Sequence, residues 1–185
     1  MFHLKYGEDV TEEFVYKIAP IDQACYKAEY MGQAINSVIR YRKNKRTFVF
    51  VCNEKNELVG YINFFPCGKA LTDDIMWKCD HIRDDEISPD EITEYDKDEN
   101  HLYMLSVAIH PDYQGTDVIK IMTKGYRDYL DRLESEGYPI TDIMASAVSS
   151  DGIRFLERNG FKRVRELSDG NIVFKSERVN YEIHN

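Results

Sequence analysis

The longest amphipathic pattern in the chain covers residues 116–136. Its apolar positions recur every three or four residues, which is the spacing of one face of an α-helix. Gly125 interrupts the pattern at a cost of about 1 kcal/mol relative to alanine, and Gly137 and Pro139 end it. The pattern predicts a long helix whose buried stripe consists of Val118, Ile119, Met122, Tyr126, Tyr129, Leu130 and Leu133.

Shorter segments follow the patterns of strands. Apolar and β-branched runs at residues 47–52 and 58–65 flank a turn at residues 53–56, which predicts a hairpin. A second hairpin is predicted near the end of the chain, around Ser168-Asp-Gly170. The other predicted strands, and the two strands of this closing hairpin, are residues 13–18, 102–109, 140–148, 161–167 and 171–175.

Residues 102–109 form a nearly continuous apolar run, which is typical of a central strand covered on both faces. Its predicted buried side chains are Leu102, Leu105, Val107 and Ile109.

Further helical segments complete the pattern. Pro20-Ile-Asp22 opens a helical region, and residues 31–42 place three apolar side chains on one face: Ile35, Val38 and Ile39. Ser149 or Ser150 can cap a helix that runs to Arg158. A short helix is predicted at residues 70–79, before a stretch with little periodicity.

The order of the elements predicts the fold class. A strand and two helices precede the first hairpin, and an insertion follows it. The chain then alternates strand, helix, strand and helix before the closing hairpin. This order predicts an α/β (α+β) fold with a single mixed, mostly antiparallel sheet flanked by helices on both faces. A length of 185 residues predicts one domain, residues 1–185, with an insertion at about residues 66–100.

Charge is concentrated in that insertion. The chain has a net charge of −9, and residues 66–100 hold twelve acidic and four basic residues, which gives −8. This balance argues against nucleic-acid binding, which needs a basic surface. The insertion is either a solvated surface excursion or an acidic rim that attracts a cationic amine.

Cysteine spacing and hydropathy exclude other classes. The four cysteines form no Cys-x-x-Cys pair, and Cys79-x-His81 is too little for a metal site, so no metal is predicted. The chain shows neither a secretory h-region nor an apolar run of membrane-spanning length. We therefore predict a cytoplasmic protein that binds no membrane.

The stretch Leu105-Ser-Val-Ala-Ile-His-Pro-Asp-Tyr-Gln-Gly115 joins the central strand to the long helix through a turn at Pro111. The first turn of that helix directs free backbone N–H groups and the positive end of its dipole beyond the strand. This geometry predicts a site for an anion.

Two segments, in this order of elements, resemble the GNAT superfamily of acyl-CoA N-acyltransferases. Val107-Ala-Ile-His-Pro-Asp-Tyr-Gln-Gly115 is similar to the family's strand, turn and helix with its Arg/Gln-x-x-Gly-x-Gly/Ala loop. Asp151-Gly-Ile-Arg-Phe-Leu-Glu-Arg-Asn-Gly-Phe161 is similar to the family's fourth helix, which ends in Gly-Phe. The resemblance covers residues 13–175 and supports the predicted fold.

The resemblance implies transfer of an acetyl or other acyl group from acetyl-CoA, or another acyl-CoA, to an amine by direct attack in a ternary complex. Backbone groups at the end of the central strand would hold the pantetheine arm, and an inward amide there would stabilise the oxyanion. The start of the long helix would hold the pyrophosphate. The implied cofactor-binding residues are Val107, Ala108, Ile109, Gln114, Gly115, Thr116, Asp117, Val118, Ile119 and Ser149.

The chain departs from the family at the pyrophosphate loop. Asp117 and Ile119 stand at the family's glycine and glycine-or-alanine positions, and side chains there hinder close approach of the backbone. Asp117 also adds negative charge, although capping the helix favours it by about 0.3–1 kcal/mol. Ser149 stands where the family often has Asn. The basic residues that either compensate or form a solvated helix face are Lys120 and Lys124.

The family's proton-transfer groups are also missing. Its general-acid Tyr falls on Leu156 and its acidic base on Leu105, and neither residue titrates. The predicted catalytic residues are therefore others. Tyr103 shares a strand face with Leu105, where it either acts as a general acid or only packs in the core or cleft. Glu99 and His101 lie at the start of the strand and either transfer protons through water or have ordinary surface roles. Such losses lower the expected rate by about 10²–10⁴-fold.

Three functional hypotheses follow. The first is an N-acetyltransferase. The second is a catalytically inactive GNAT-fold binding or regulatory module, motivated by the four departures at Asp117, Ile119, Ser149 and Leu156. The third is a related enzyme with an aminoacyl-tRNA donor, which the acidic composition disfavours.

The partner predicted for the first hypothesis is a small-molecule or peptide amine, and the acidic insertion favours a cationic one. An edge strand near the C-terminus could pair with a second copy to form a homodimer, but the sequence leaves the oligomeric state open.

Overall fold

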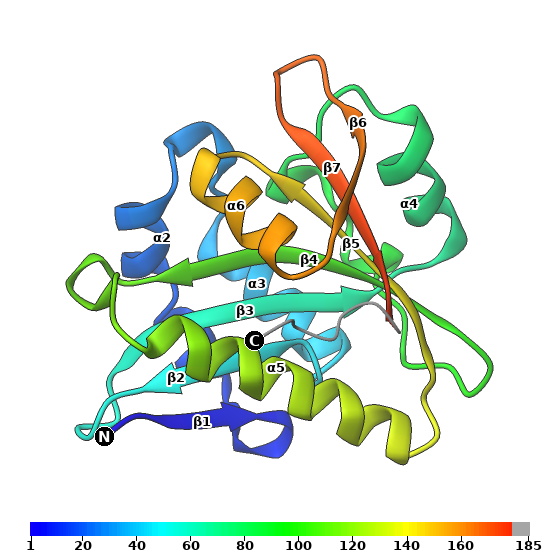
Figure 1. The fold of residues 1–185 in the computed structure, drawn as a ribbon. Coiled ribbons are helices and arrows are strands. Elements are labelled where there is room, and N and C mark those ends of the chain that lie inside the picture. The colour runs from blue at the N-terminus through cyan, green and yellow to red at the C-terminus, as the bar shows by residue number, and fades with distance from the viewer. Residues whose placement is uncertain (179–185) are drawn as a thin grey trace.

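The computed structural model describes residues 1–178, which form one seven-stranded sheet with helices on both faces (Figure 1). The strand order is β1-β2-β3-β4-β5-β7-β6. Only β4 and β5 run parallel within this part of the chain, so the predicted mixed, mostly antiparallel sheet is confirmed. The strands are β1 His3–Tyr6, β2 Phe48–Cys52, β3 Leu58–Pro66, β4 Asn100–Ile109, β5 Ile140–Ala147, β6 Lys162–Glu166 and β7 Ile172–Glu177.

The helices divide between the two faces of the sheet. α5 and α6 lie on the near side in Figure 1 and bury one core cluster. α1, α2 and α3 cover part of the opposite face and bury a second cluster against β2 and β3. The helices are α1 Glu12–Tyr16, α2 Ala19–Cys25, α3 Ala34–Lys43, α4 Lys69–Asp73, α5 Val118–Ser135 and α6 Ser150–Arg158. Short 3₁₀ turns lie at Gly7–Asp9, Ala28–Tyr30, Asp84–Glu86, Pro89–Glu91 and Pro111–Tyr113.

The first strand lies earlier than predicted. β1 pairs with β2 from His3↔Cys52 to Tyr6↔Val49, whereas residues 13–18 are largely helical. The hydroxyl of Thr11 caps α1 by accepting a hydrogen bond from the Phe14 N–H at 3.5 Å. Phe14 and Val15 are buried, so the apolar run that suggested a strand forms the inner side of a short helix.

The predicted apolar face of α3 is wrong in part. Val38 is fully buried, but Ile35 and Ile39 are 38% and 40% exposed. The buried side of α3 carries Arg40, which pairs with a carboxylate, and Tyr41, whose hydroxyl donates to a backbone carbonyl. Polar groups with hydrogen-bond partners can be buried, and here they take the inner positions.

β4 contains a bulge at Leu105. Asn63 of β3 pairs with Ser106 and Phe64 pairs with Met104, so Leu105 has no partner in this register. A bulge inserts one residue and shifts the alternation of side chains. Leu105 follows the alternation of the first half of β4 and packs, partly buried, on the face opposite α5, and the bulge returns Val107 and Ile109 to the α5 face. The side chains of β4 that pack in the cluster under α5 are Leu102, Met104, Val107 and Ile109.

The acidic insertion packs against the sheet. It contains α4, a π-helical turn at Asp74–Lys78, and an isolated bridge between Cys67 and Ile92. Its apolar side chains share a third core cluster with Tyr103 of β4. None of its twelve acidic residues is buried, so only the charged side of the insertion is solvated. Its buried residues in that cluster are Cys67, Leu71, Ile75, Met76, Ile87 and Ile92.

Turn and cap residues end the elements that carry the site. Gly137 has φ +88° at the end of α5, and Gly115 has φ +75° before its start. The Oγ of Ser149 accepts a hydrogen bond from the Gly152 N–H at 3.1 Å, so the predicted capping of α6 is confirmed. Within residues 1–178, no helix has the length and apolar composition needed to cross a membrane.

Candidate active site

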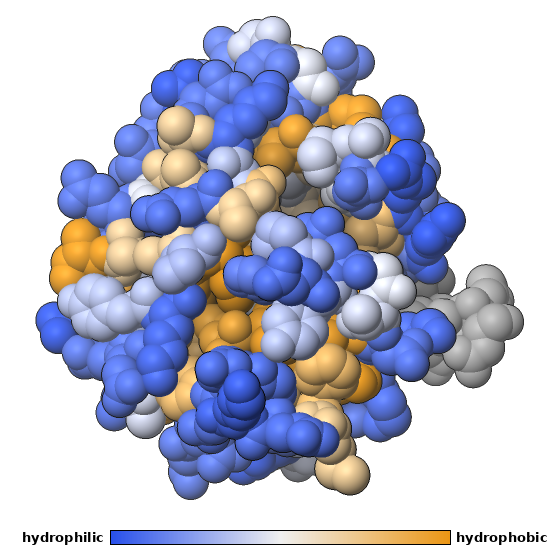
Figure 2. All heavy atoms as spheres, turned by 90° about the vertical axis from the view of Figure 1, so that its left-hand side faces the viewer, coloured by the Kyte–Doolittle hydropathy of each residue, from blue (hydrophilic) through white to orange (hydrophobic). Residues whose placement is uncertain are grey.

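A cavity of about 1650 Å³ opens where β4 and β5 separate. The two strands pair from Asn100↔Ile140 to Met104↔Ala145. Beyond Met104, β4 stays with β3 and β5 stays with β7, so the sheet splits. Figure 2 shows this side of the molecule, with apolar atoms at the bottom of a hollow between hydrophilic side chains. The split gives access to the middle of the sheet from both of its faces.

On the α5 and α6 side, the cavity is lined by basic residues, which we call the basic half. Lys124 pairs with Asp128 at 2.5 Å and Arg154 pairs with Asp151, while Lys120 pairs with Asp117 at 2.9 Å. The backbone amides of the first turn of α5 also face no partner within their helix. The members of the basic half are Lys120, Lys124, Arg127, Arg154 and Arg158.

The structure brings together seven of the ten predicted cofactor-binding residues. Those that line the cavity are Val107, Ala108, Ile109, Gln114, Gly115, Ile119 and Ser149. Thr116, Asp117 and Val118 do not line it. The Asp117 side chain makes no cap bond and instead pairs with Lys120, which lowers the pKa of its carboxyl group. Asp117 therefore adds less negative charge to the cavity than its position in the loop suggested.

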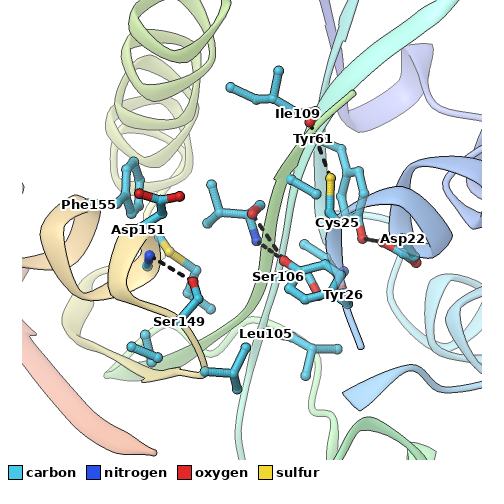
Figure 3. Close-up of a pocket in the computed structure, with 18 of the residues that line it drawn as sticks. Asp22, Cys25, Tyr26, Tyr61, Leu105, Ser106, Ile109, Ser149, Asp151 and Phe155 are labelled. Carbon is cyan, nitrogen blue, oxygen red and sulfur yellow. Dashed lines mark hydrogen bonds between the residues drawn. The ribbon is translucent and has the colours of Figure 1, made fainter. Parts of the chain in front are cut away.

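The free edge of β4 lies in the middle of the cavity. His110 donates its N–H to Val59 of β3, so in antiparallel alternation the backbone groups of Val107 and Ile109 point away from β3. The Tyr26 hydroxyl donates to the Val107 carbonyl at 3.0 Å and accepts from the Val107 N–H at 3.3 Å (Figure 3). The Cys25 thiol donates to the Ile109 carbonyl at 3.2 Å. Side chains at the end of α2 thus occupy this edge.

Asp22 lies on the α2 side of the cavity. Burial raises the pKa of its carboxyl group to about 6, and the nearby Asp84 adds to the rise. The Tyr61 hydroxyl donates a hydrogen bond to Asp22 Oδ1, which opposes it (Figure 3). Asp22 is therefore a carboxylate that titrates near neutral pH inside a cavity, which is typical of a group that accepts or donates protons. We call this side of the cavity the acidic half, since its two charged lining residues are Asp22 and Asp84.

Tyr103, the predicted acid, lines the same cavity but is 2% exposed. Its ring packs edge-on against Phe65, with centroids 5.9 Å apart. Burial raises the pKa of its phenol well above its usual range. These surroundings favour the packing role over the proton-transfer role.

Glu99 and His101 do not line the cavity. Glu99 directly precedes β4 and His101 lies at its start, four positions before Leu105, which is about 13 Å at the usual rise. His101 Nδ1 lies 3.0 Å from Asp142 on β5, and Lys175 on β7 lies 2.8 Å from the same carboxylate. This cluster ties three strands together, so the geometry does not support the predicted catalytic roles of Glu99 and His101.

The sequence reasoning missed Asp22 and Tyr26. They are four residues apart at α2, so both side chains lie on the same side of the helix. This spacing was the only local feature of the sequence that could have indicated a shared site. Their contacts with Tyr61 and Val107 span 39 and 81 positions of the chain. No local pattern reports contacts over such separations.

The fold and site geometry agree with the comparison to known families. The model of the acetyltransferase (GNAT) family matches residues 15–161, well over half of the chain. The chain therefore belongs to the GNAT family of acetyltransferases, and acyl transfer from CoA is supported at the level of that family. None of the curated proteins compared with the chain matches it.

Solved structures share the fold at low sequence identity. The GNAT-like decarboxylase GphF, in complex with isobutyryl-CoA, is 10% identical with a TM-score of 0.71, covering 95% of this chain and 99% of that chain. The loading GNATL domain of CurA from Lyngbya majuscula is 12% identical with a TM-score of 0.67, covering 97% and 98%. The ribosomal-protein-S18-alanine N-acetyltransferase from Escherichia coli is 11% identical with a TM-score of 0.59, covering 96% and 94%. At such identities the likeness concerns the fold alone.

Proposed function

We propose that this protein transfers an acetyl or other acyl group from acyl-CoA to an amine, with both substrates bound in the divided cavity. The observation that carries the proposal is the separation of charge across the split sheet. Cations line the α5 and α6 side, a titrating carboxylate lies on the α2 side, and the free edge of β4 lies between them. A phosphate-bearing thioester donor and an amine acceptor need these two environments.

The basic half fits the phosphates of CoA. The loop has lost the family's bare glycines, but the amides of Ile119 and Lys120 still begin a helix of 18 residues. Basic side chains from α5 and α6 supplement them. In this proposal, phosphate binding relies more on side-chain cations than on close backbone approach. Acyl-CoA would supply the activated thioester, and the chain would hold it in position.

Asp22 is the proposed general base. Its pKa of about 6 leaves it mostly ionised at pH 7, so it can accept a proton from the attacking amine. The amine nitrogen bonds to the thioester carbonyl carbon, the carbon–sulfur bond breaks, and the CoA thiolate leaves. The proton that Asp22 accepted passes through water to the thiolate, which restores the carboxylate. The Val107 N–H is the proposed donor to the oxyanion, because it points into the gap between β4 and β5.

Tyr26 competes with the donor in this proposal. Its hydroxyl bonds both backbone groups of Val107, so a donor that uses them displaces it. Tyr26→Phe removes that bond and keeps the ring, and we expect acetyl-CoA to bind several-fold more tightly, since one hydrogen bond contributes about 0.5–1.5 kcal/mol. Calorimetric titration with acetyl-CoA measures this, with Tyr30→Phe as the matched control. Unchanged or weaker binding would exclude Tyr26 as a competitor.

Donor binding and turnover test the function itself. Acetyl-CoA at about 100 times its Kd should stabilise the protein by about 2.7 kcal/mol, which thermal unfolding detects. Release of the CoA thiol is then followed with a panel of amines. Binding with no amine-dependent release would contradict the enzyme proposal.

The second candidate is a catalytically inactive CoA-binding or regulatory module. The observations that favour it are the buried Leu156 at the family's tyrosine position and the occupation of the β4 edge by Tyr26 and Cys25. It agrees with donor binding and predicts no turnover with any amine.

A further inference from the structure

The acidic half restricts the kind of amine that the cavity can accept. Its surface around Asp22 is mostly apolar and aromatic, and among residues 1–178 Asp84 is the only other charged residue that lines this side. Within the described part of the chain, every cation that lines the cavity belongs to α5 or α6, on the other face of the sheet. The apolar and aromatic residues that surround the acceptor space are Ile18, Tyr30, Met31, Ile82, Tyr103 and Leu105.

Arg40 pairs with Asp84 of this half, so its charge is already engaged. It is 1% exposed, and both of its Nη atoms donate to Asp84, one to the carboxylate and one to the backbone carbonyl. Gly32 packs directly against the Asp84 carboxylate, where any larger side chain would collide. Arg40 therefore neutralises Asp84 and is not exposed to a substrate.

Asp22 is thus the one carboxylate of the acidic half, among residues 1–178, that has no cationic partner. Its neighbours are the Tyr61, Tyr26 and Cys25 side chains and, at longer range, Asp84. An ammonium or amine group on the substrate satisfies this carboxylate. A carboxylate on the substrate finds no cation here, and leaving a charge unpaired in a buried site is strongly unfavourable.

We propose that the acceptor is a monoamine with an apolar body and no carboxylate near its nitrogen. The inference rests on the proposed transfer to an amine, and it excludes free amino acids as good acceptors. It also gives a second ammonium no advantage, because Asp84 is already paired with Arg40. The acidic insertion contributes only Ile82 and Asp84 to the lining, so its charge does not select a polycation inside the cavity.

Three amines with the same ring isolate the carboxylate. Phenethylamine has no carboxyl group, phenylalanine amide has an uncharged carboxamide in its place, and phenylalanine has a charged carboxylate. Calorimetry measures their binding to the protein saturated with CoA, and kcat/KM is measured with acetyl-CoA. We expect phenylalanine to be at least about 100-fold poorer than phenethylamine in both measurements, because of its unpaired charge. The amide is expected to lie close to phenethylamine.

A charge introduced at Gln33 provides the converse test. Gln33 lines the cavity, is exposed, and makes no side-chain cap bond at the start of α3, so its replacement leaves the fold intact. Gln33→Arg should raise the affinity for phenylalanine relative to phenethylamine by about tenfold, and Gln33→Met, with a similar length and no charge, should not.

The outcomes separate this inference from the proposed function. Equal binding of phenylalanine and phenethylamine, or no binding of any of the three amines at millimolar concentration, would overturn the inference. Selective binding of phenethylamine without formation of its acetyl product would uphold the inference and contradict the acyl-transfer function.

Discussion

The basic half and the acidic half of the cavity hold their charges in different ways. In the basic half, Lys120, Lys124 and Arg154 are exposed and pair with carboxylates three or four residues away. In the acidic half, Asp22 is largely buried and its pKa is raised. Exposed charges are screened and individually weak, whereas a buried charge dominates its surroundings. We therefore expect the binding energy for the donor phosphates to be spread over many residues of the basic half. Proton transfer should instead depend on one residue of the acidic half, Asp22.

The largest effect is expected at Asp22. Asp22→Asn keeps the volume and can still accept the Tyr61 hydrogen bond, but it cannot take a proton. We expect kcat to fall by about 100-fold or more while the Kd for acetyl-CoA stays within about twofold. In the unmodified protein, kcat/KM should fall about tenfold per pH unit below about pH 6, where Asp22 becomes protonated. Steady-state kinetics from pH 5 to 8 measures both.

Tyr103→Phe is the matched control for that change. We expect a loss of less than about threefold, because the Tyr103 phenol is buried and its pKa is raised. A loss as large as that of Asp22→Asn would return the catalytic role to Tyr103.

The same Asp22→Asn change should stabilise the protein at high pH. The pKa of Asp22 is higher in the folded state than its ordinary 3.8, so its contribution to stability is complete below about pH 4 and is lost as pH rises through about 6. Removing the carboxylate should therefore stabilise the variant at pH 8, relative to pH 4, by about 2 kcal/mol, or about 5 °C in Tm. Asp117→Asn, at an exposed carboxyl group whose pKa is lowered, should show no such gain.

Charge reversal in the basic half should have a smaller and salt-dependent effect. Lys124→Glu together with Arg158→Glu should weaken binding of acetyl-CoA by about tenfold at low salt, and by less at high salt. Calorimetric titration at two salt concentrations measures this, with Lys55→Glu, outside the cavity, as the control. A loss that does not depend on salt would mean that these side chains act through packing.

The smallest effect on the affinity for acetyl-CoA is expected at Asp117, in the loop whose sequence departs from the family's glycine pattern. Asp117 does not line the cavity and is neutralised by Lys120. Asp117→Gly should therefore change the affinity for acetyl-CoA by less than about threefold. A large gain would show that the lost glycine does control phosphate binding.

Elements with a strong local pattern were predictable from the sequence. The stripe of α5, the hairpin of β2 and β3, the Ser149 cap and the Gly137 terminus all depend on residues close in the chain. β1 was missed because four partly exposed residues pair with β2 across 49 or fewer positions, without a distinctive pattern of their own. Long-range pairing, not local propensity, makes this segment a strand.

The candidate site was only partly predictable for a similar reason. Backbone positions near the end of β4 could be inferred, since Ile109 ends the strand and Gln114 lies in the short turn that joins it to α5. Asp22 acquires its raised pKa from burial, and Tyr26 acquires its role from the Val107 backbone. Both properties exist only once α2 is folded over the open edge of the sheet.

The bulge at Leu105 divides β4 into two halves, and the residue numbers that face α5 are even in one half and odd in the other. Before it, even-numbered residues such as Met104 face α5, and after it odd-numbered residues such as Val107 do. One extra residue thus uncouples the half of the strand that pairs with β5 from the half that borders the cavity. Deletion of Leu105 would give a continuous register with β3 and leave Met104 and Val107 on the α5 face, so the extra residue changes the local bend and twist of the strand while each later side chain keeps its face.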